Sequence, residues 1–260
     1  MSKKGNIKEV FRKIMFCISL VVFIGCSFKL YTIWREYHDN SKSYDEVREF
    51  APEEVVSENN DTQNNEPKFV FKKEDYDSLL AMNSDFKAWL YIPNTEVSYP
   101  VVQTNNNDYY LKHNFKKEQN SGGAIFISSN NKEPFVEQNT IIHGHHMRDG
   151  SMFASLMKFK EEDFAKGTPI YVNTKNELLQ YEVFSVFYET ANNDSYQSGF
   201  TNETQYVDYL NKLKGKSLFD LGRSELIKDD KIITLSTCDY DVDDGRLLVC
   251  ARLISQSNYE

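Results

Sequence analysis

The feature that most constrains this chain is a long apolar stretch close to its N-terminus. The stretch runs from Ile14 to Trp34, 21 residues in which Lys29 is the one charged side chain. As a helix it would be about 31 Å long at about 1.5 Å per residue, which matches the hydrocarbon core of a bilayer. Residues 14–34 are therefore predicted to form a transmembrane signal anchor. Residues 1–13 carry five bases against one acid, which predicts a cytoplasmic N-terminal tail.

Two other interpretations of this apolar stretch remain open. A cleaved signal peptide has the same basic flank and apolar region, but no Ala-x-Ala-like cleavage site follows. Lipoprotein processing at Cys26 is the second, because Phe23–Cys26 loosely resembles a lipobox, although Phe is a poor first residue and the chain stays apolar after the cysteine. The anchor and lipoprotein interpretations both leave the rest of the chain outside the cell and tethered to the membrane.

The segment after the anchor, residues 35–67, is acidic and poor in large apolar side chains. It has ten acids against three bases, and such a composition buries too little apolar surface to offset the entropy lost on ordering. We interpret it as an extracellular stalk, in which residues 34–50 could continue the membrane helix for a few turns. The folded domain is then expected over residues 68–260, which is long enough for one core.

The composition excludes several classes of protein. The net charge is −9 and the isoelectric point is about 5.2, so a phosphate-binding surface rich in Lys and Arg is not expected and nucleic acid is not a predicted partner. Four cysteines without a Cys-x-x-Cys pair are too few for a disulfide scaffold.

The folded domain is predicted to be mainly β. Short β-branched or aromatic runs bounded by Asn, Asp, Gly or Pro predict eight strands and hence a barrel or a sandwich. Helical spacing is restricted to three segments, of which the last lies between two late strands. The predicted strands are 89–92, 97–103, 124–127, 140–143, 169–172, 178–189, 231–238 and 246–254, and the predicted helices are 74–82, 151–159 and 203–213.

The last two strands carry the most informative chemistry. Cys238 ends one strand and Arg246 begins the next, with seven residues between them. If the two strands form a hairpin with Cys238 opposite Arg246, their side chains share one face because strand side chains alternate. A guanidinium beside the thiol favours the thiolate and could also stabilise an oxyanion after attack on a carbonyl.

Without further evidence, the simpler interpretation is structural: Cys238 would be a small buried apolar residue and Arg246 a solvated residue at a strand end. The same register places Cys250 about four residues from the level of Cys238, roughly 13 Å at 3.3 Å per residue, which is too far for a disulfide. Cys238 is therefore expected to be a free thiol outside the cell, which is unusual and favours a chemical role.

A second cluster of chemistry lies at the end of the strand near residue 142. His143, His145 and His146 are three of the five histidines in the chain. They could supply a general base, a metal site or simply structural side chains. The alternation of His143 and His145 suits ligands on one strand, but the intervening glycine and the lack of a matching third ligand weaken the metal interpretation.

These motifs together resemble the signature of the sortases, the membrane-anchored cysteine transpeptidases of Gram-positive bacteria. The resemblance rests on Thr234–Cys238, on Arg246, and on Ile142–His145 about ninety residues upstream, and it covers about residues 69–260. It implies a closed eight-stranded sortase-type β-barrel with an N-terminal helix and a helical insertion. By the same resemblance, Cys238 is the nucleophile, His145 the catalytic histidine and Arg246 the catalytic arginine, and Ser236 is expected to line the substrate groove.

The resemblance is greatest to class B sortases, on account of Tyr99–Gln103, Tyr109–Leu111, the run 144–147 and the helical insertion. It implies cleavage of an Asn-Pro-x-Thr type sorting motif after Thr through a Cys238 thioester. Surface proteins bearing that motif and a peptidoglycan precursor amine, on lipid II or a cross-bridge, are the implied partners. We expect a monomer that needs no metal, calcium or other cofactor. Ser-Pro and Leu-Pro variants of the motif stay open.

Three alternatives to an active sortase also remain. A surface-anchored binding module would explain the anchor and the stalk without a reactive thiol. A zinc-dependent hydrolase would use His143, His145 and His146 as ligands. A protein that keeps the sortase fold without the activity is the third. The acids near the nucleophile, Asp239 and Asp241, are interpreted as a solvated loop and left out of the predicted site.

Overall fold

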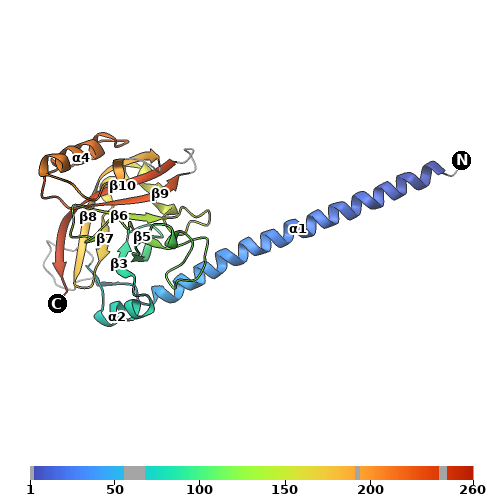
Figure 1. Cartoon of the computed structure of the whole chain (residues 1–260), viewed down its shortest axis with the longest axis horizontal. Helices are drawn as coiled ribbons and strands as arrows, with labels where there is room; N and C mark the ends of the chain where they lie inside the picture. The colour runs from blue at the N-terminus through green and yellow to red at the C-terminus, as the bar shows by residue number, and fades with distance from the viewer. Residues whose placement is uncertain (1–2, 56–67, 191–193, 240–244, 260) are drawn as a thin grey trace. The chain divides into compact units, whose positions relative to one another are not determined.

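The computed structural model describes residues 3–55, 68–190, 194–239 and 245–259. Eight strands close into a barrel in the order β10-β8-β7-β3-β4-β5-β6-β9. Figure 1 shows the strands gathered in one body with α4 at its edge. The predicted eight-stranded barrel is thus confirmed, with each predicted strand found within a few residues of its expected bounds. The strands are β3 (Phe86–Tyr91), β4 (Ser98–Val102), β5 (Ile125–Ile127), β6 (Asn139–Gly144), β7 (Ile170–Asn173), β8 (Glu177–Thr190), β9 (Ile232–Asp239) and β10 (Gly245–Asn258).

The strand pairing follows the alternation of side chains in the sequence. Most neighbours are antiparallel, whereas β4 with β5 and β6 with β9 are parallel. The buried strand residues are mostly large and apolar, and Trp89, Tyr99 and Phe187 are each at most 1% exposed. Several strands are buried on both faces, and Phe187 packs with Tyr206 and Leu210 of the helical insertion. This burial fixes the register, because a shift by one residue would move every side chain to the other face of its strand.

Helices cover the barrel at several points. The expected helices 74–82 and 203–213 are observed as α2 (Lys73–Met82) and α4 (Glu203–Gly215). The expected helix 151–159 is instead the 3₁₀ segment η2 (Ala154–Lys160), followed by a short α3 (Glu162–Gly167) that the sequence pattern did not indicate. Two further 3₁₀ turns, η1 (Tyr109–Leu111) and η3 (Asp194–Tyr196), lie in the connections.

The helix α4 is the insertion between β8 and β9. Asn202 caps its N-terminus by accepting a hydrogen bond from the backbone N–H of Gln205 at 2.9 Å. Tyr206, Leu210 and Leu213 recur on one face and are fully buried in a cluster with residues of β8 and β10. Figure 1 shows the helix beside those strands. The insertion therefore packs on the barrel through one amphipathic face, as its spacing predicts.

The N-terminal helix α1 runs from Lys3 to Arg48 and includes the whole predicted anchor. By its length and composition this helix could cross a membrane. The contacts divide the chain into two units, Met1–Lys42 and Ser43–Glu260. The second unit begins before the predicted boundary at residue 68, because the last turns of α1 bury Tyr44 and Val47 and a small sheet pairs β1 (Glu53–Val55) with β2 (Lys68–Val70).

Candidate active site

Two neighbouring strand ends bring the candidate catalytic residues together. The strands β6 and β9 are parallel, with His143 opposite Ser236 and Gly144 opposite Thr237 as the last pairs. His145 is the first residue after β6, and Cys238 is the next residue of β9. Because paired strands lie about 4.8 Å apart, the two backbones reach the edge of the barrel side by side.

The register of the last hairpin supplies the third candidate. Cys238 is paired with Arg246 across β9 and β10, Ser236 with Leu248, and Thr234 with Cys250. This is the register predicted from the sequence, which is therefore confirmed. This register brings the backbone of Arg246 directly opposite that of Cys238. The side chain of Cys238 itself, and the loop residues 240–244 with Asp241, lie outside the described part of the structure, as does the side chain of Asp239.

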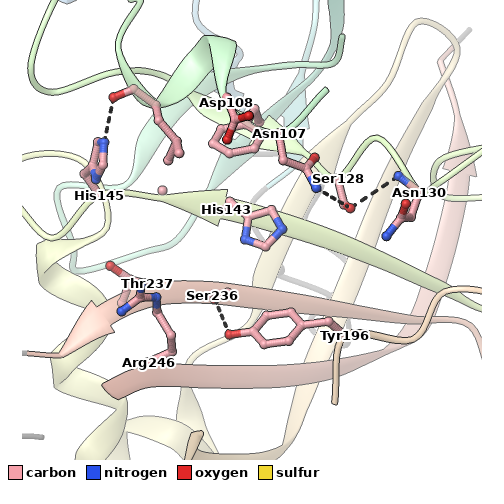
Figure 2. A pocket seen from close by; sticks show the side chains of 13 residues that line it. Asn107, Asp108, Ser128, Asn130, His143, His145, Tyr196, Ser236, Thr237 and Arg246 are labelled. Carbon is pink, nitrogen blue, oxygen red and sulfur yellow. Dashed lines mark hydrogen bonds between the residues drawn. The ribbon is translucent and has the colours of Figure 1, made fainter. Parts of the chain in front are cut away.

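A pocket of about 670 Å³ opens at this edge of the barrel. His145, Ser236 and Arg246, three of the four predicted site residues, line it, and Figure 2 shows the side chains that border this pocket. His145 lies just after β6, whereas Ser236 is in β9 and Arg246 in β10. The pocket is large enough for a short peptide segment. The rest of its lining is Asn107, Asp108, Leu111, Phe126, Ser128, Asn130, His143, Gly144, Tyr196 and Thr237.

A backbone hydrogen bond fixes the imidazole of His145. Its Nε2 lies 2.8 Å from the carbonyl oxygen of Leu111, drawn as a dashed line in Figure 2. A carbonyl oxygen only accepts, so Nε2 carries the proton of this hydrogen bond. Nδ1 is then the nitrogen that is left to exchange a proton with a thiol or an amine.

His143 lies in the pocket wall beside the other candidates. Its ring is 5.2 Å from that of Phe126 and stacks on that of Tyr196 at 5.9 Å. Burial, with a second contribution from the positive charge of Arg246, lowers the pKa of His143 from 6.5 to about 4. His143 is therefore neutral at pH 7, and it adds no positive charge to that of Arg246.

Ser236 is held by a residue that the sequence analysis did not identify. The hydroxyl groups of Tyr196 and Ser236 are 3.0 Å apart and hydrogen-bonded. Tyr196 lies in η3, a connection with no regular spacing, so no sequence signal marked it. Its neighbour Ser195 is buried and donates to Glu189 at 3.0 Å, and Glu189 also pairs with Lys216. A partly exposed ion pair between Glu189 and Lys216 thus anchors the segment that carries Tyr196.

Two glycines allow the close packing around His145. A Cβ on Gly144 would lie 2.5 Å from a methyl carbon of Ile125 and 2.7 Å from the ring of Phe153. Gly123 has φ +59°, and a Cβ there would lie 2.4 Å from the carbonyl oxygen of Tyr110 and 3.2 Å from Cδ2 of His145. No larger residue fits at either position without moving its neighbours.

The other arginine and cysteine of this hairpin have structural roles. Arg252 pairs with Glu182 at 2.5 Å, well along β10 from the pocket. Cys250 is fully buried beside Thr234, and burial raises the pKa of its thiol to about 12, so it stays protonated and unreactive.

The contacts of His143 and His145 bear on the metal interpretation of the 143–146 region. Within the described ranges, no three side chains of His, Cys, Asp or Glu are close enough together to hold a metal ion. His143 packs against aromatic rings, and His145 is bonded to a backbone carbonyl. The geometry of these side chains therefore gives the zinc-hydrolase alternative no support.

The barrel and the strand-end arrangement define a cysteine transpeptidase of the sortase class. The family model for the sortase domain matches residues 90–254. The sortase B of Listeria monocytogenes is 33% identical over 255 residues, which are 96% of this chain and all of that protein. The chain belongs to the sortase family, and it is an enzyme with a cysteine active site.

Solved structures of class B sortases have the same fold. The sortase B of Bacillus anthracis in complex with AAEK1 has a TM-score of 0.71 and 33% identity, covering 85% of this chain and 99% of that one. The Staphylococcus aureus sortase B–substrate complex has a TM-score of 0.65 and 30% identity, covering 70% and 85% of the two chains. The predicted resemblance to class B is thereby confirmed.

Proposed function

We propose that this enzyme cleaves the C-terminal sorting motif of surface proteins after a threonine and transfers them to an amine of the cell wall. The single observation that carries the proposal is the strand-end register. Cys238 is paired with Arg246 across β9 and β10. The last pair between β6 and β9 is Gly144 with Thr237, and His145 and Cys238 are the residues that follow them. A nucleophile, a proton carrier and a fixed cation around one pocket are the groups that acyl transfer needs.

In this mechanism the Cys238 thiolate attacks the threonine carbonyl, and Arg246 stabilises the oxyanion that forms. The tetrahedral intermediate collapses when the C–N bond breaks, and His145 donates a proton from Nδ1 to the leaving amine. The acyl group is then held on Cys238 as a thioester. An amine of a peptidoglycan precursor attacks the thioester, gives up a proton to His145 and releases the thiolate.

The substrate motif is proposed to be of the Asn-Pro-x-Thr type. This choice rests on similarity to class B sortases, among which the Staphylococcus aureus enzyme has been solved as a substrate complex. The pocket suits a short polar peptide, since Ser236, Tyr196 and Asn107 supply hydroxyl and amide groups along its wall. Residues 14–34 are proposed to anchor the enzyme with its N-terminus in the cytoplasm and residues 43–260 outside.

The test is incubation of the full chain, in detergent micelles, with Asn-Pro-x-Thr, Ser-Pro-x-Thr and Leu-Pro-x-Thr peptides and an amine acceptor, read by mass spectrometry. We expect cleavage after Thr and a transfer product with the Asn-Pro-x-Thr peptide, and none from Cys238→Ala or His145→Ala. Preference for another peptide would correct the motif, whereas full activity of Cys238→Ala would overturn the mechanism.

A further inference from the structure

The last turns of α1, residues 43–48, pack on the barrel next to the loops that hold His145. We call residues 43–48 the docking segment. Tyr44 is 2% exposed and Val47 is fully buried, although the surrounding sequence from 35 to 67 is acidic and poor in large apolar residues. Such burial in a polar connection indicates a specific contact, because ordering a segment of this composition has an entropic cost that the contact must offset.

Tyr44 touches the backbone that borders the candidate catalytic histidine. Its hydroxyl donates to the carbonyl oxygen of Gly123 at 2.8 Å, and its ring meets the edge of Tyr99 at 5.2 Å. Burial, then the nearby Tyr99, raises the pKa of the Tyr44 hydroxyl, so it remains a donor at every working pH. Gly123 in turn packs so closely on the ring of His145 that a Cβ would lie 3.2 Å from Cδ2. One hydrogen bond thus separates the docking segment from the peptide unit that limits movement of the imidazole.

The docking segment also holds the loop that carries the acceptor of His145. Ser43 accepts a hydrogen bond from the buried side chain of Asn114 at 3.0 Å, and Glu46 forms an ion pair with Lys116. These two partners follow Leu111, whose carbonyl accepts the Nε2–H of His145. The loop is tied to Gly123 as well, since the N–H of Ala124 donates to the carbonyl of Tyr110 at 2.9 Å.

The backbone of His145 is supported from the other side by Tyr99. The Tyr99 hydroxyl accepts from the N–H of Met152 at 3.0 Å, and the next residue, Phe153, donates its N–H to the carbonyl of His145 at 2.9 Å. The guanidinium of Arg48 lies 5.0 Å from the centre of the Tyr99 ring, a cation–π contact. The docking segment therefore reaches both the side-chain and the main-chain supports of His145.

We infer that the docking segment is part of the catalytic apparatus and that Tyr44 is a positioning residue for His145, acting through Gly123. The inference rests on the proposed function, in which His145 transfers a proton. It implies that catalysis depends on the chain that joins the predicted membrane anchor to the barrel, in addition to the barrel itself. Small displacements of a proton-transfer group lower the rate of the chemical step while leaving substrate binding unchanged.

The test compares Tyr44→Phe with Tyr206→Phe in the full chain in detergent micelles. Tyr206 is a matched control, because it is fully buried and its hydroxyl donates to the backbone carbonyls of Gln138 and Asp230 on the α4 side of the barrel. We expect Tyr44→Phe to lower kcat about 5- to 10-fold with KM changed less than 2-fold, the range of an imperfectly held catalytic group. Tyr206→Phe should lower Tm by a similar amount and leave kcat unchanged.

Two further measurements distinguish a positioning role of the docking segment from a general loss of protein stability: one is spectroscopic, and the other reverses the charges of an ion pair. In protein labelled with ¹⁵N-histidine, the Nε2–H of His145 should exchange faster with water in Tyr44→Phe than in the parent or in Tyr206→Phe. Glu46→Lys and Lys116→Glu should each lower kcat about 2-fold, the size expected for an exposed pair, and the double reversal should restore it.

The outcomes separate this inference from the proposed function. An unchanged kcat and Nε2–H exchange in Tyr44→Phe, with His145→Ala inactive, would overturn the positioning role and leave the proposed function standing. Equal losses of kcat in Tyr44→Phe and Tyr206→Phe would also overturn it, because the effect would then be one of stability. An active His145→Ala would contradict the proposed function itself.

Discussion

The neutral state of His143 makes the stability of the protein depend on pH in a predictable window. The pKa of His143 is lowered from 6.5 to about 4 by burial and by Arg246. Between these values the unfolded chain binds a proton that the folded protein does not bind. The contribution of His143 to the free energy of unfolding is therefore fully present above pH 6.5. It is lost as the pH is lowered from 6.5 toward 4. The difference between the two pKa values corresponds to an upper bound of about 3 kcal/mol, since one pH unit is worth about 1.4 kcal/mol. We expect the free energy of unfolding to fall by about 2 kcal/mol, less than this bound, since the pocket admits some solvent to the ring of His143.

The assay is urea unfolding of residues 43–260 at pH 7 and pH 4.5, for the parent and for His143→Phe. Phenylalanine keeps an aromatic ring between Phe126 and Tyr196, so the variant loses the titration with little loss of packing. Carboxylates and other histidines titrate in both proteins and cancel in the comparison. We expect the parent to lose about 2 kcal/mol more than His143→Phe between the two pH values. Identical losses in the two proteins would refute the reasoning.

Two further predictions concern the candidate site. Arg246→Lys should lower kcat by about 100-fold in the peptide assay, because an ammonium cannot reproduce the planar fork of donors. Arg252→Lys, whose parent side chain pairs with Glu182, is the control and should stay active; equal losses would contradict a specific role for Arg246. Gly144→Ala should lower the free energy of unfolding by about 1–3 kcal/mol in urea titrations, since the added methyl meets the ring of Phe153 at 2.7 Å. An unchanged stability would mean that this strand end is not tightly packed.

The barrel strands and the Cys238–Arg246 register could be predicted from the sequence because they depend on short-range patterns. Short β-branched or aromatic runs bounded by turn residues identify the strands. The hairpin register predicted across the seven-residue loop between Cys238 and Arg246 is the one observed. The sortase signature supplied the role of His145, which spacing alone left open among three histidines.

The supports of the site could not be predicted, because they are made by backbone atoms or by residues distant in sequence. The acceptor of His145 is the carbonyl of Leu111, and a carbonyl carries no residue identity. Tyr196 reaches Ser236 from a 3₁₀ turn, and Tyr44 reaches Gly123 across 79 residues. Gly123, where φ is +59° and the carbonyl oxygen of Tyr110 leaves no room for a Cβ, is a residue type that could have marked this close backbone approach. The helix expected at 151–159 is 3₁₀ from 154 to 160, which the same apolar spacing does not distinguish from an α-helix.

The central claim is that Cys238 carries the acyl group during transfer, and the most direct measurement is the intact mass of the enzyme during turnover. The full chain is mixed with an Asn-Pro-x-Thr peptide without an amine acceptor, quenched in acid and digested to locate any adduct. The account predicts an added mass equal to the peptide up to Thr, located on the fragment that contains Cys238 and removed by hydroxylamine as a thioester is. Cleavage of the peptide with no adduct, or with an adduct on another residue, would contradict the account.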